Sequence, residues 1–140
     1  VEEAKIMIGS AYEKKGENQK AIAALQKALA EHPEGKYASK AETYMAEIYL
    51  SKLKNVAKAV ETYQKIADNA KYDYDSRKIS QYQVGNIYEI QGNIAKAIEA
   101  YKKLIEGFAK PMSKPGHPAD KIDKAYILNL QQKMPAQPAA

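Results

Sequence analysis

Small and apolar residues recur at helical spacing in three separate stretches of the chain. In each stretch an alanine is followed four residues later by a large residue and seven residues later by another apolar one, in the sets Ala21–Leu25–Ala28, Ala59–Tyr63–Ile66 and Ala97–Tyr101–Leu104. Positions i, i+4 and i+7 lie on one face of an α-helix. Each stretch therefore predicts a helix that buries this face, with the small alanine at a close approach to another helix.

Each of these helices follows another segment with its own recurring pattern. In that segment a small residue precedes a tyrosine by three positions, as Gly9–Tyr12, Ala46–Tyr49 and Gly85–Tyr88. The longer stretches "NVAKAVETYQKI" (55–66) and "NIAKAIEAYKKL" (93–104) are identical at seven of twelve positions. Such self-similarity is typical of repeat proteins, and it predicts three units of two helices each, at about 3–33, 36–70 and 75–108.

The residues between the paired helices indicate how each turn is built. Gly16 and Gly92 follow the first helix of their units, where a left-handed backbone ends a helix and glycine has no Cβ penalty. The second unit has no glycine there, so we expect Asn55 to be either the left-handed residue or the N-cap of the next helix. Ala59 and Gly85 are expected to lie where helices cross closely.

The chain changes character after the third unit. Residues 109–119, "AKPMSKPGHPA", carry three prolines and a glycine and predict an irregular connection. A last helix is predicted from about Asp120 to Met134, with Asp120 as its N-cap and Ile127 and Leu130 on its apolar stripe. Such a helix would cover the last apolar face of the stack. Residues 1–134 are predicted to form one all-α domain, and "PAQPAA" (135–140) a disordered tail.

Together these positions resemble the tetratricopeptide repeat (TPR) family. The family's second-helix pattern is complete in the first unit as Ala21, Leu25, Ala28 and Pro33. The resemblance implies an α-solenoid of three TPR-like repeats with a C-terminal capping helix. The long first helix "YASKAETYMAEIYL" is similar to that of bacterial cell-envelope members, which favours a periplasmic or cell-envelope location over the cytoplasm. The absence of cysteine fits such an oxidising compartment.

Charge and hydropathy argue against a nucleic-acid partner and against a membrane-spanning segment. The net charge is +5, and residues 102–140 carry seven lysines against Glu106, Asp120 and Asp123, so the rest of the chain is nearly neutral. A neutral surface argues against a continuous nucleic-acid interface. No apolar run is long enough to span a bilayer. Because the chain begins at Val1 rather than Met, we expect a processed protein or an excised piece.

The residues that usually carry chemistry do not form a catalytic or metal-binding pattern. The two histidines, His32 and His117, each stand beside a proline in a loop, without a nucleophile–base pair or a phosphate-binding glycine loop. We therefore predict no enzyme and no cofactor. Asp73 and Asp75 suggest a calcium loop, but the next alternate position is Arg77, and no glycine follows. Asp75 is instead interpreted as the N-cap of the next helix.

The family resemblance implies that the first helices line a concave groove that binds a partner. The candidate groove residues are therefore Ile6, Ser10, Glu13, Thr43, Tyr44, Glu47, Leu50, Tyr82, Asn86, Glu89 and Ile90. Their mixture of tyrosine, acid and aliphatic side chains suits a peptide or helix of a partner protein. It does not match the basic clamp with which some members hold a C-terminal carboxylate. The alternative is a structural module that stacks with itself or with further repeats of a larger protein.

Overall fold

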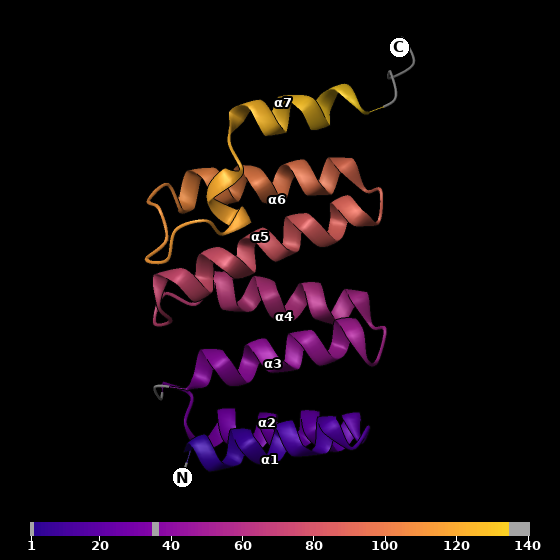
Figure 1. Ribbon diagram of the computed structural model, residues 1–140, viewed down its shortest axis with the longest axis vertical. Helices are drawn as coiled ribbons and strands as arrows, with labels where there is room; N and C mark the ends of the chain where they lie inside the picture. Colours follow the sequence, from indigo (N-terminus) through magenta and orange to yellow (C-terminus); the bar gives the residue numbers. More distant parts are fainter. Residues whose placement is uncertain (1, 35–36, 135–140) are drawn as a thin grey trace. The chain divides into compact units, whose positions relative to one another are not determined.

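The computed structural model describes residues 2–34 and 37–134, and within these ranges it contains helices and no strand (Figure 1). The prediction of an all-α helical repeat fold is therefore confirmed. The helices are α1 (Glu2–Lys14), α2 (Asn18–Glu31), α3 (Ala38–Ser51), α4 (Val56–Asp68), α5 (Tyr74–Ile90), α6 (Ile94–Gly107), the short 3-10 helix η1 (Pro118–Lys121) and α7 (Lys124–Gln132).

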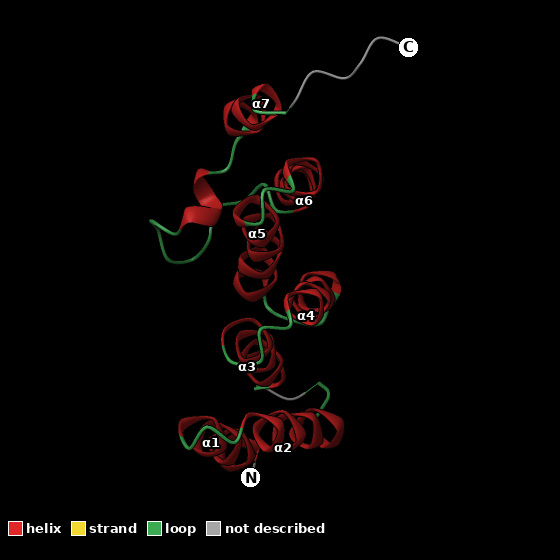
Figure 2. Ribbon diagram, turned by 90° about the vertical axis from the view of Figure 1, so that its right-hand side faces the viewer, coloured by secondary structure: helices red, strands yellow, loops and turns green. Residues whose placement is uncertain are grey.

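The chain divides into two compact units, Val1–Arg77 and Lys78–Ala140. The first unit holds α1 to α4 and the first turn of α5, and the second holds the rest of α5, α6, η1 and α7. Helices that follow one another in the chain form neighbouring pairs, α1 with α2, α3 with α4, and α5 with α6 (Figure 2). A single domain over residues 1–134 stays a prediction.

The core of the first unit lies between its two helix pairs. Helix α3 contacts both α2 and α1, so the second pair covers the first. Ala21 and Ala59 are completely buried, as predicted from their spacing, because a methyl side chain lets neighbouring helices approach. The buried cluster comprises Ile6, Ala21, Ile22, Leu25, Ala41, Met45, Ile48, Tyr49 and Ala59.

The turns follow the glycine pattern with one difference. Gly16 and Gly92 have φ values of 78° and 79°, which confirms the predicted left-handed turns. In the second repeat the left-handed residue is Lys54, with φ 54°. Asn55 is the N-cap, and its side chain accepts a hydrogen bond of 3.1 Å from the Lys58 amide. Of the two expectations for Asn55, the cap is confirmed.

Gly85 of α5 lies at a very close helix approach in the second unit. A Cβ atom on Gly85 would lie 2.4 Å from Cε1 of the Tyr101 ring, which is shorter than any normal contact. Gly9 of α1 is the matching residue of the first repeat, where a Cβ would lie 2.8 Å from Cγ of Leu25. The close crossing predicted for Gly85 is therefore confirmed. The Tyr101 ring of α6 is the group that leaves no room for a Cβ atom there.

The N-cap of α5 is Asp73, and the interpretation of Asp75 as the cap is wrong. The Asp73 carboxylate accepts hydrogen bonds from the Ser76 amide at 2.9 Å and the Ser76 hydroxyl at 2.8 Å. Partial burial acts to raise the pKa of Asp73, but these hydrogen bonds outweigh it and the pKa is lowered. Helix α5 begins at Tyr74, two residues before the Ser76 that a cap at Asp75 implies, so Asp75 falls within its first turn. Nearby, the Tyr72 hydroxyl donates to Glu42 at 2.7 Å.

The C-terminal helix, in contrast, begins later than predicted. Residues 118–121 form η1, and α7 runs from Lys124 to Gln132, so Met134 lies beyond it. Its N-cap is Asp123, whose carboxylate accepts from the Tyr126 amide at 2.8 Å. The assignment of Asp120 as the cap is wrong, because its carboxylate pairs with Lys78 of α5 instead. The predicted disordered tail, 135–140, lies outside the described residues.

Candidate functional site

The first-helix face of the first unit keeps most of its predicted groove residues at least partly accessible. Ser10 and Glu13 on α1 and Thr43, Tyr44 and Leu50 on α3 are half-buried, and Glu47 on α3 is exposed. Positions 44, 47 and 50 are three residues apart and so share one side of α3. Ile6 differs from the others because only 4% of it is exposed, and it packs in the core of the unit.

Two carboxylates interact electrostatically across α1 and α3. Crowding by the surrounding protein, and then the negative charge of Glu13, raise the pKa of Glu47 above its ordinary value, although Glu47 keeps its contact with solvent. Neither carboxylate forms an ion pair or accepts a hydrogen bond from any residue that the structure describes. The face thus carries two neighbouring acids without a cation of their own.

Tyr63 of α4 is a residue of the first unit whose pKa responds to Glu47. Only 4% of this residue is exposed, yet its hydroxyl has no hydrogen-bond partner among the described residues. Burial, and then the charge of Glu47, raise the pKa of Tyr63 to about 12. The charge of Glu47 on α3 therefore acts on the Tyr63 hydroxyl of α4.

The corresponding face of the second unit is engaged by the chain itself. Glu89 on α5 accepts a hydrogen bond of 2.9 Å from the Tyr101 hydroxyl and one of 2.7 Å from the Tyr126 hydroxyl of α7. The Tyr101 and Tyr126 rings meet edge to face, with centroids 5.5 Å apart. Burial, and then the hydrogen bond to Glu89, raise the pKa of Tyr126 to about 12. Glu89 is thus satisfied internally.

Tyr82 of α5 also contacts the C-terminal segment. Its ring meets the His117 ring edge to face at 5.7 Å and lies 6.3 Å from the Tyr101 ring. Of the remaining two predicted groove residues of this unit, Asn86 is half-buried, like Tyr82 and Glu89, and Ile90 is 78% exposed. In this unit Tyr82 and Glu89 thus contact residues of the C-terminal segment, whereas Ile90 is exposed to solvent.

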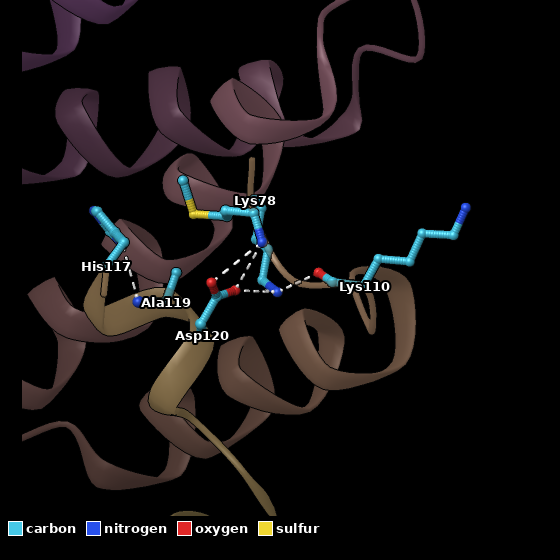
Figure 3. Close-up of polar contacts among 6 residues, drawn as sticks. Lys78, Lys110, His117, Ala119 and Asp120 are labelled. Atoms are coloured by element: carbon cyan, nitrogen blue, oxygen red, sulfur yellow. Dashed lines mark hydrogen bonds and ion pairs between the residues drawn. The ribbon is translucent and has the colours of Figure 1, made fainter. Parts of the chain in front are cut away.

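A buried ion pair fastens the irregular C-terminal segment to α5 (Figure 3). Lys78 is 4% exposed, and its ammonium group lies 2.6 Å from Asp120 and donates to the Lys110 carbonyl at 2.6 Å. Asp120 also accepts from the Met112 amide at 3.2 Å. The hydrogen bond from Lys78 lowers the pKa of the Asp120 carboxyl. The His117 Nδ1 accepts from the Ala119 amide at 3.0 Å, so this histidine shapes the same segment.

Two general properties concern metal ligands and membrane spans. The described residues contain no group of three or more His, Cys, Asp or Glu side chains that could hold a metal ion. No helix in the described part of the chain is long and apolar enough to cross a membrane.

The chain belongs to the tetratricopeptide repeat family. One TPR family model matches residues 6–76 and another matches residues 80–106. No curated protein matches the chain by sequence. Proteins of this family generally mediate protein–protein interaction, so the chain is of the class of helical interaction scaffolds, a class that is generally not enzymatic. The cell-envelope likeness stays a prediction.

Solved structures agree with this fold. Two crystal structures of a candidate kinesin light chain from Podosopora anserina, built of nearly identical TPR-like repeats, are similar to the chain. The first is 19% identical with a TM-score of 0.56 over 93% of this chain. The second, of a variant of the same protein, is 18% identical with a TM-score of 0.58 over 91%. This chain spans 65% and 64% of their lengths.

Sequence reasoning misses several of the residues that define the two faces. Tyr126 and Lys78 stand out in no pattern of the sequence, and the spacing of Tyr63 predicts only a packing role. The repeat register holds the signal for Tyr63, because it aligns with Tyr101, whose hydroxyl crosses to the first helix of its own pair. The Lys78–Asp120 pair joins residues far apart in the chain and has no local signal.

Proposed function

We propose that this protein is an interaction scaffold that holds an extended or helical segment of a partner protein against the first-helix face of the first unit. The contacts would come from Ser10, Glu13, Thr43, Tyr44, Glu47 and Leu50. One difference between the two units supports the proposal. The acids on the first-helix face of the first unit have no partner among the described residues. In the second unit, Tyr82 and Glu89 contact the chain's own C-terminal segment.

The residue types on this face suit a protein segment. Half-buried Tyr44 and Leu50 offer apolar contact area on the same side of α3, and both pack against the core of the unit. An aromatic side chain held by its surroundings loses little conformational entropy when a partner binds it. Asn86 and Ile90 are the members of the predicted set in the second unit that remain open to a partner.

The test is to select binding peptides from a random library displayed on phage, using the whole chain as bait. We expect Tyr44→Ala to weaken the selected peptides about tenfold, the loss typical of an aromatic contact at an interface. Tyr82→Ala should have a smaller effect, because His117 and Tyr101 already flank that ring. Leu128→Ala, at an exposed apolar position of α7, is the control. Unchanged affinity in a folded Tyr44→Ala variant would exclude this face.

A second candidate function is stacking with another copy or with further repeats. Ile8 on α1 and Leu128 on α7 are 52% and 58% exposed, and each borders a shallow hollow, of about 470 Å³ and about 400 Å³ respectively. Exposed apolar side chains beside hollows often mark contact surfaces. Sedimentation across protein concentrations tests this function. Self-association should raise the apparent mass, and Ile8→Lys should abolish the rise, whereas a constant monomer mass would contradict it.

A further inference from the structure

A groove lies between α1 and α2 of the first unit and has a volume of about 470 Å³. We refer to it as the α1–α2 groove. Its apolar lining consists of Ile8 and Tyr12 of α1 and Ala23 and Ala24 of α2, and lysines of both helices complete it. Ile8 and Tyr12 are four residues apart and so share one side of α1. Because Ile8 is 52% exposed, this side presents apolar area to solvent.

The matching side of α3 in the second repeat is covered by a helix. Met45 and Tyr49 correspond to Ile8 and Tyr12 in the repeat register, but they are only 7% and 8% exposed. Both lie in one buried cluster with Ile22 of α2, and α2 contacts α3. This position of the repeat therefore accepts the apolar face of a helix. The α1–α2 groove offers the same kind of surface to solvent.

A glutamate stands between two lysines in the second helix of two repeats and is missing from the first. The three sets are Lys58–Glu61–Lys65, Lys96–Glu99–Lys103 and Lys20–Ala23–Lys27. In the second repeat the Glu61 carboxylate lies 3.9 Å from the Lys58 ammonium and 3.6 Å from the Lys65 ammonium. Ala23 lines the groove at the matching position and supplies no charge. Lys20 and Lys27 therefore lack the carboxylate that lies between their counterparts in the second repeat.

The lysines of the groove have little internal compensation. Lys27 forms no ion pair with any residue that the structure describes. Lys20 lies 3.7 Å from Glu17, and both side chains are exposed, so this pair contributes little. Lys5 is paired with Glu31. The α2 side of the groove thus carries two positive charges that a partner can neutralise.

We propose that the α1–α2 groove binds an amphipathic helix of a partner protein that carries glutamate or aspartate along the edges of its apolar face. The apolar side chains of that helix would pack on Ile8, Tyr12 and Ala24. Its carboxylates would lie near Lys20 and Lys27, in place of the missing glutamate. Complementary charge at the rim of an apolar contact fixes the register of the bound helix.

The α1–α2 groove is separate from the face of the proposed function. Successive residues of an α-helix are turned by about 100°, since 3.6 residues make one turn. Ser10 and Glu13 therefore point away from the side of α1 that holds Ile8 and Tyr12. A partner helix in the groove would leave the first-helix face free, so the inference goes beyond the proposed function and can be tested without it.

Charge favours an acidic partner over a second copy of the chain. The hollow on the second unit is also apolar, with Ile105 of α6 and Leu128 of α7 in its lining. Its lysines, Lys102 and Lys124, carry the same sign as those of the α1–α2 groove, although Glu106 offsets part of this charge. Joining the two hollows would bring like charges together, which weakens association. An acidic helix brings the opposite charge.

The experiment uses the whole chain, labelled with ¹⁵N, and two synthetic peptides that differ only in charge. The first, Ac-AAELEAALAELEAALA-NH₂, has leucine on one helix face and glutamates seven residues apart on each edge, the spacing of Lys20 and Lys27. The second carries glutamine in place of each glutamate. We expect the glutamate peptide to bind about fivefold more tightly at low salt, the gain of two exposed ion pairs, and to shift the amide signals of Ile8 and Ala24. At high salt the two affinities should converge.

Variants of α2 test the missing glutamate directly. Ala23→Glu restores the residue of the other repeats, so its carboxylate should pair with Lys20 and Lys27 and remove the fivefold preference for the glutamate peptide. Ala23→Gln has the same size without the charge and should keep the preference. Gln26→Glu adds the same charge at an exposed position of α2 outside the groove lining, and it should keep the preference as well.

The apolar contact is tested on α1. Ile8→Ser should weaken both peptides by about threefold, since it removes apolar area from the groove, whereas Tyr44→Ala should change neither. Equal affinity of the two peptides for the parent chain, or loss of the preference in Gln26→Glu as well, would overturn the inference. So would a glutamate peptide that fails to bind at millimolar concentration. Peptides that depend on Tyr44 and not on Ile8 would also overturn it, and they would support the proposed function instead.

Two measurements without peptide distinguish other occupants of the groove. If sedimentation shows an apparent mass that rises with protein concentration, and Ile8→Ser abolishes the rise, the groove binds a second copy. If phosphatidylglycerol vesicles bind the chain and the glutamate peptide does not compete with them, the groove lies on an anionic membrane. Either result would overturn the acidic helix as the occupant.

Discussion

Glu13 and Glu89 occupy the same position of their repeats but have opposite surroundings. Glu89 accepts hydrogen bonds from Tyr101 and Tyr126, and a buried ion pair fastens the segment that covers it. Glu13 has no donor among the described residues and feels a second acid, Glu47. The repeat position alone therefore does not decide what a glutamate does. The helices packed around it decide, by supplying hydroxyls in one unit and a carboxylate in the other.

We expect the largest loss of stability when the Lys78–Asp120 ion pair of the second unit is broken. Asp120→Asn should cost about 3 kcal/mol of unfolding free energy, because it leaves the buried Lys78 ammonium without its counter-charge. Lys78→Met should cost less, about 1 kcal/mol, since the remaining Asp120 is partly exposed and keeps its hydrogen bond from Met112. Urea denaturation of both variants measures the difference.

The control for this pair is Asp123→Asn, because asparagine and aspartate are equally good N-caps. The pH dependence has a defined sign. The pKa of Asp120 is lowered in the folded protein, so its contribution is present above the ordinary aspartate pKa and is lost as pH falls through the lower, folded value. An Asp120→Asn variant as stable as the parent at neutral pH would show that the ion pair does not hold the segment.

The two glycines that precede these glutamates give the next test. Gly85→Ala should cost about 2 kcal/mol, because the new methyl group would overlap the rigid Tyr101 ring. Gly9→Ala should cost less, about 1 kcal/mol, because its overlap with the buried Leu25 is smaller, 2.8 Å against 2.4 Å, and alanine favours the helix. Thermal unfolding of both variants checks the prediction, and equal effects would mean that the ring does not constrain the crossing.

Removing single tyrosine hydroxyls should change the free energy of unfolding by a smaller amount. Tyr126→Phe removes one of the two hydrogen bonds to Glu89 and should cost about 1 kcal/mol. Tyr63→Phe should be neutral within about 0.5 kcal/mol in the free protein, because its hydroxyl has no partner among the described residues. Chemical denaturation without any peptide is the measurement. A clear loss of stability in Tyr63→Phe would reveal an internal partner of this hydroxyl.

The smallest expected effect is on the melting temperature when the charge of Glu47 is removed. This change should stabilise the protein, whereas the substitutions above destabilise it. Because the pKa of Glu47 is raised in the folded protein, its contribution to stability is present below the ordinary glutamate pKa and is lost as pH rises through the folded value. Glu47→Gln should therefore raise the melting temperature slightly at neutral pH and leave it unchanged in acid. Glu89→Gln should lower it, since a charged acceptor is replaced by a neutral one. Calorimetry at two pH values compares them.

The glycine and alanine positions show how much of the fold the sequence could predict. The spacing of Ala21, Ala59 and Gly85 locates the close helix contacts, and Gly16 and Gly92 locate two turns, because these features depend on residues near one another in the chain. At the starts of α5 and α7 the N-cap is a different aspartate, a few residues away from the predicted one. Two acids close together compete for such a position, and only the path of the backbone decides which one meets the free amides.

The candidate site could be predicted in outline, since the register places Glu13, Tyr44 and Glu47 on first helices. The sequence by itself determined the repeats, their turns and the faces that they bury, because helical periodicity and glycine geometry are local properties. Only the tertiary structure decided which face is open. Lys78 meets Asp120, and Glu89 meets Tyr126, across long stretches of chain, and a contact of that kind depends on packing that no local pattern encodes.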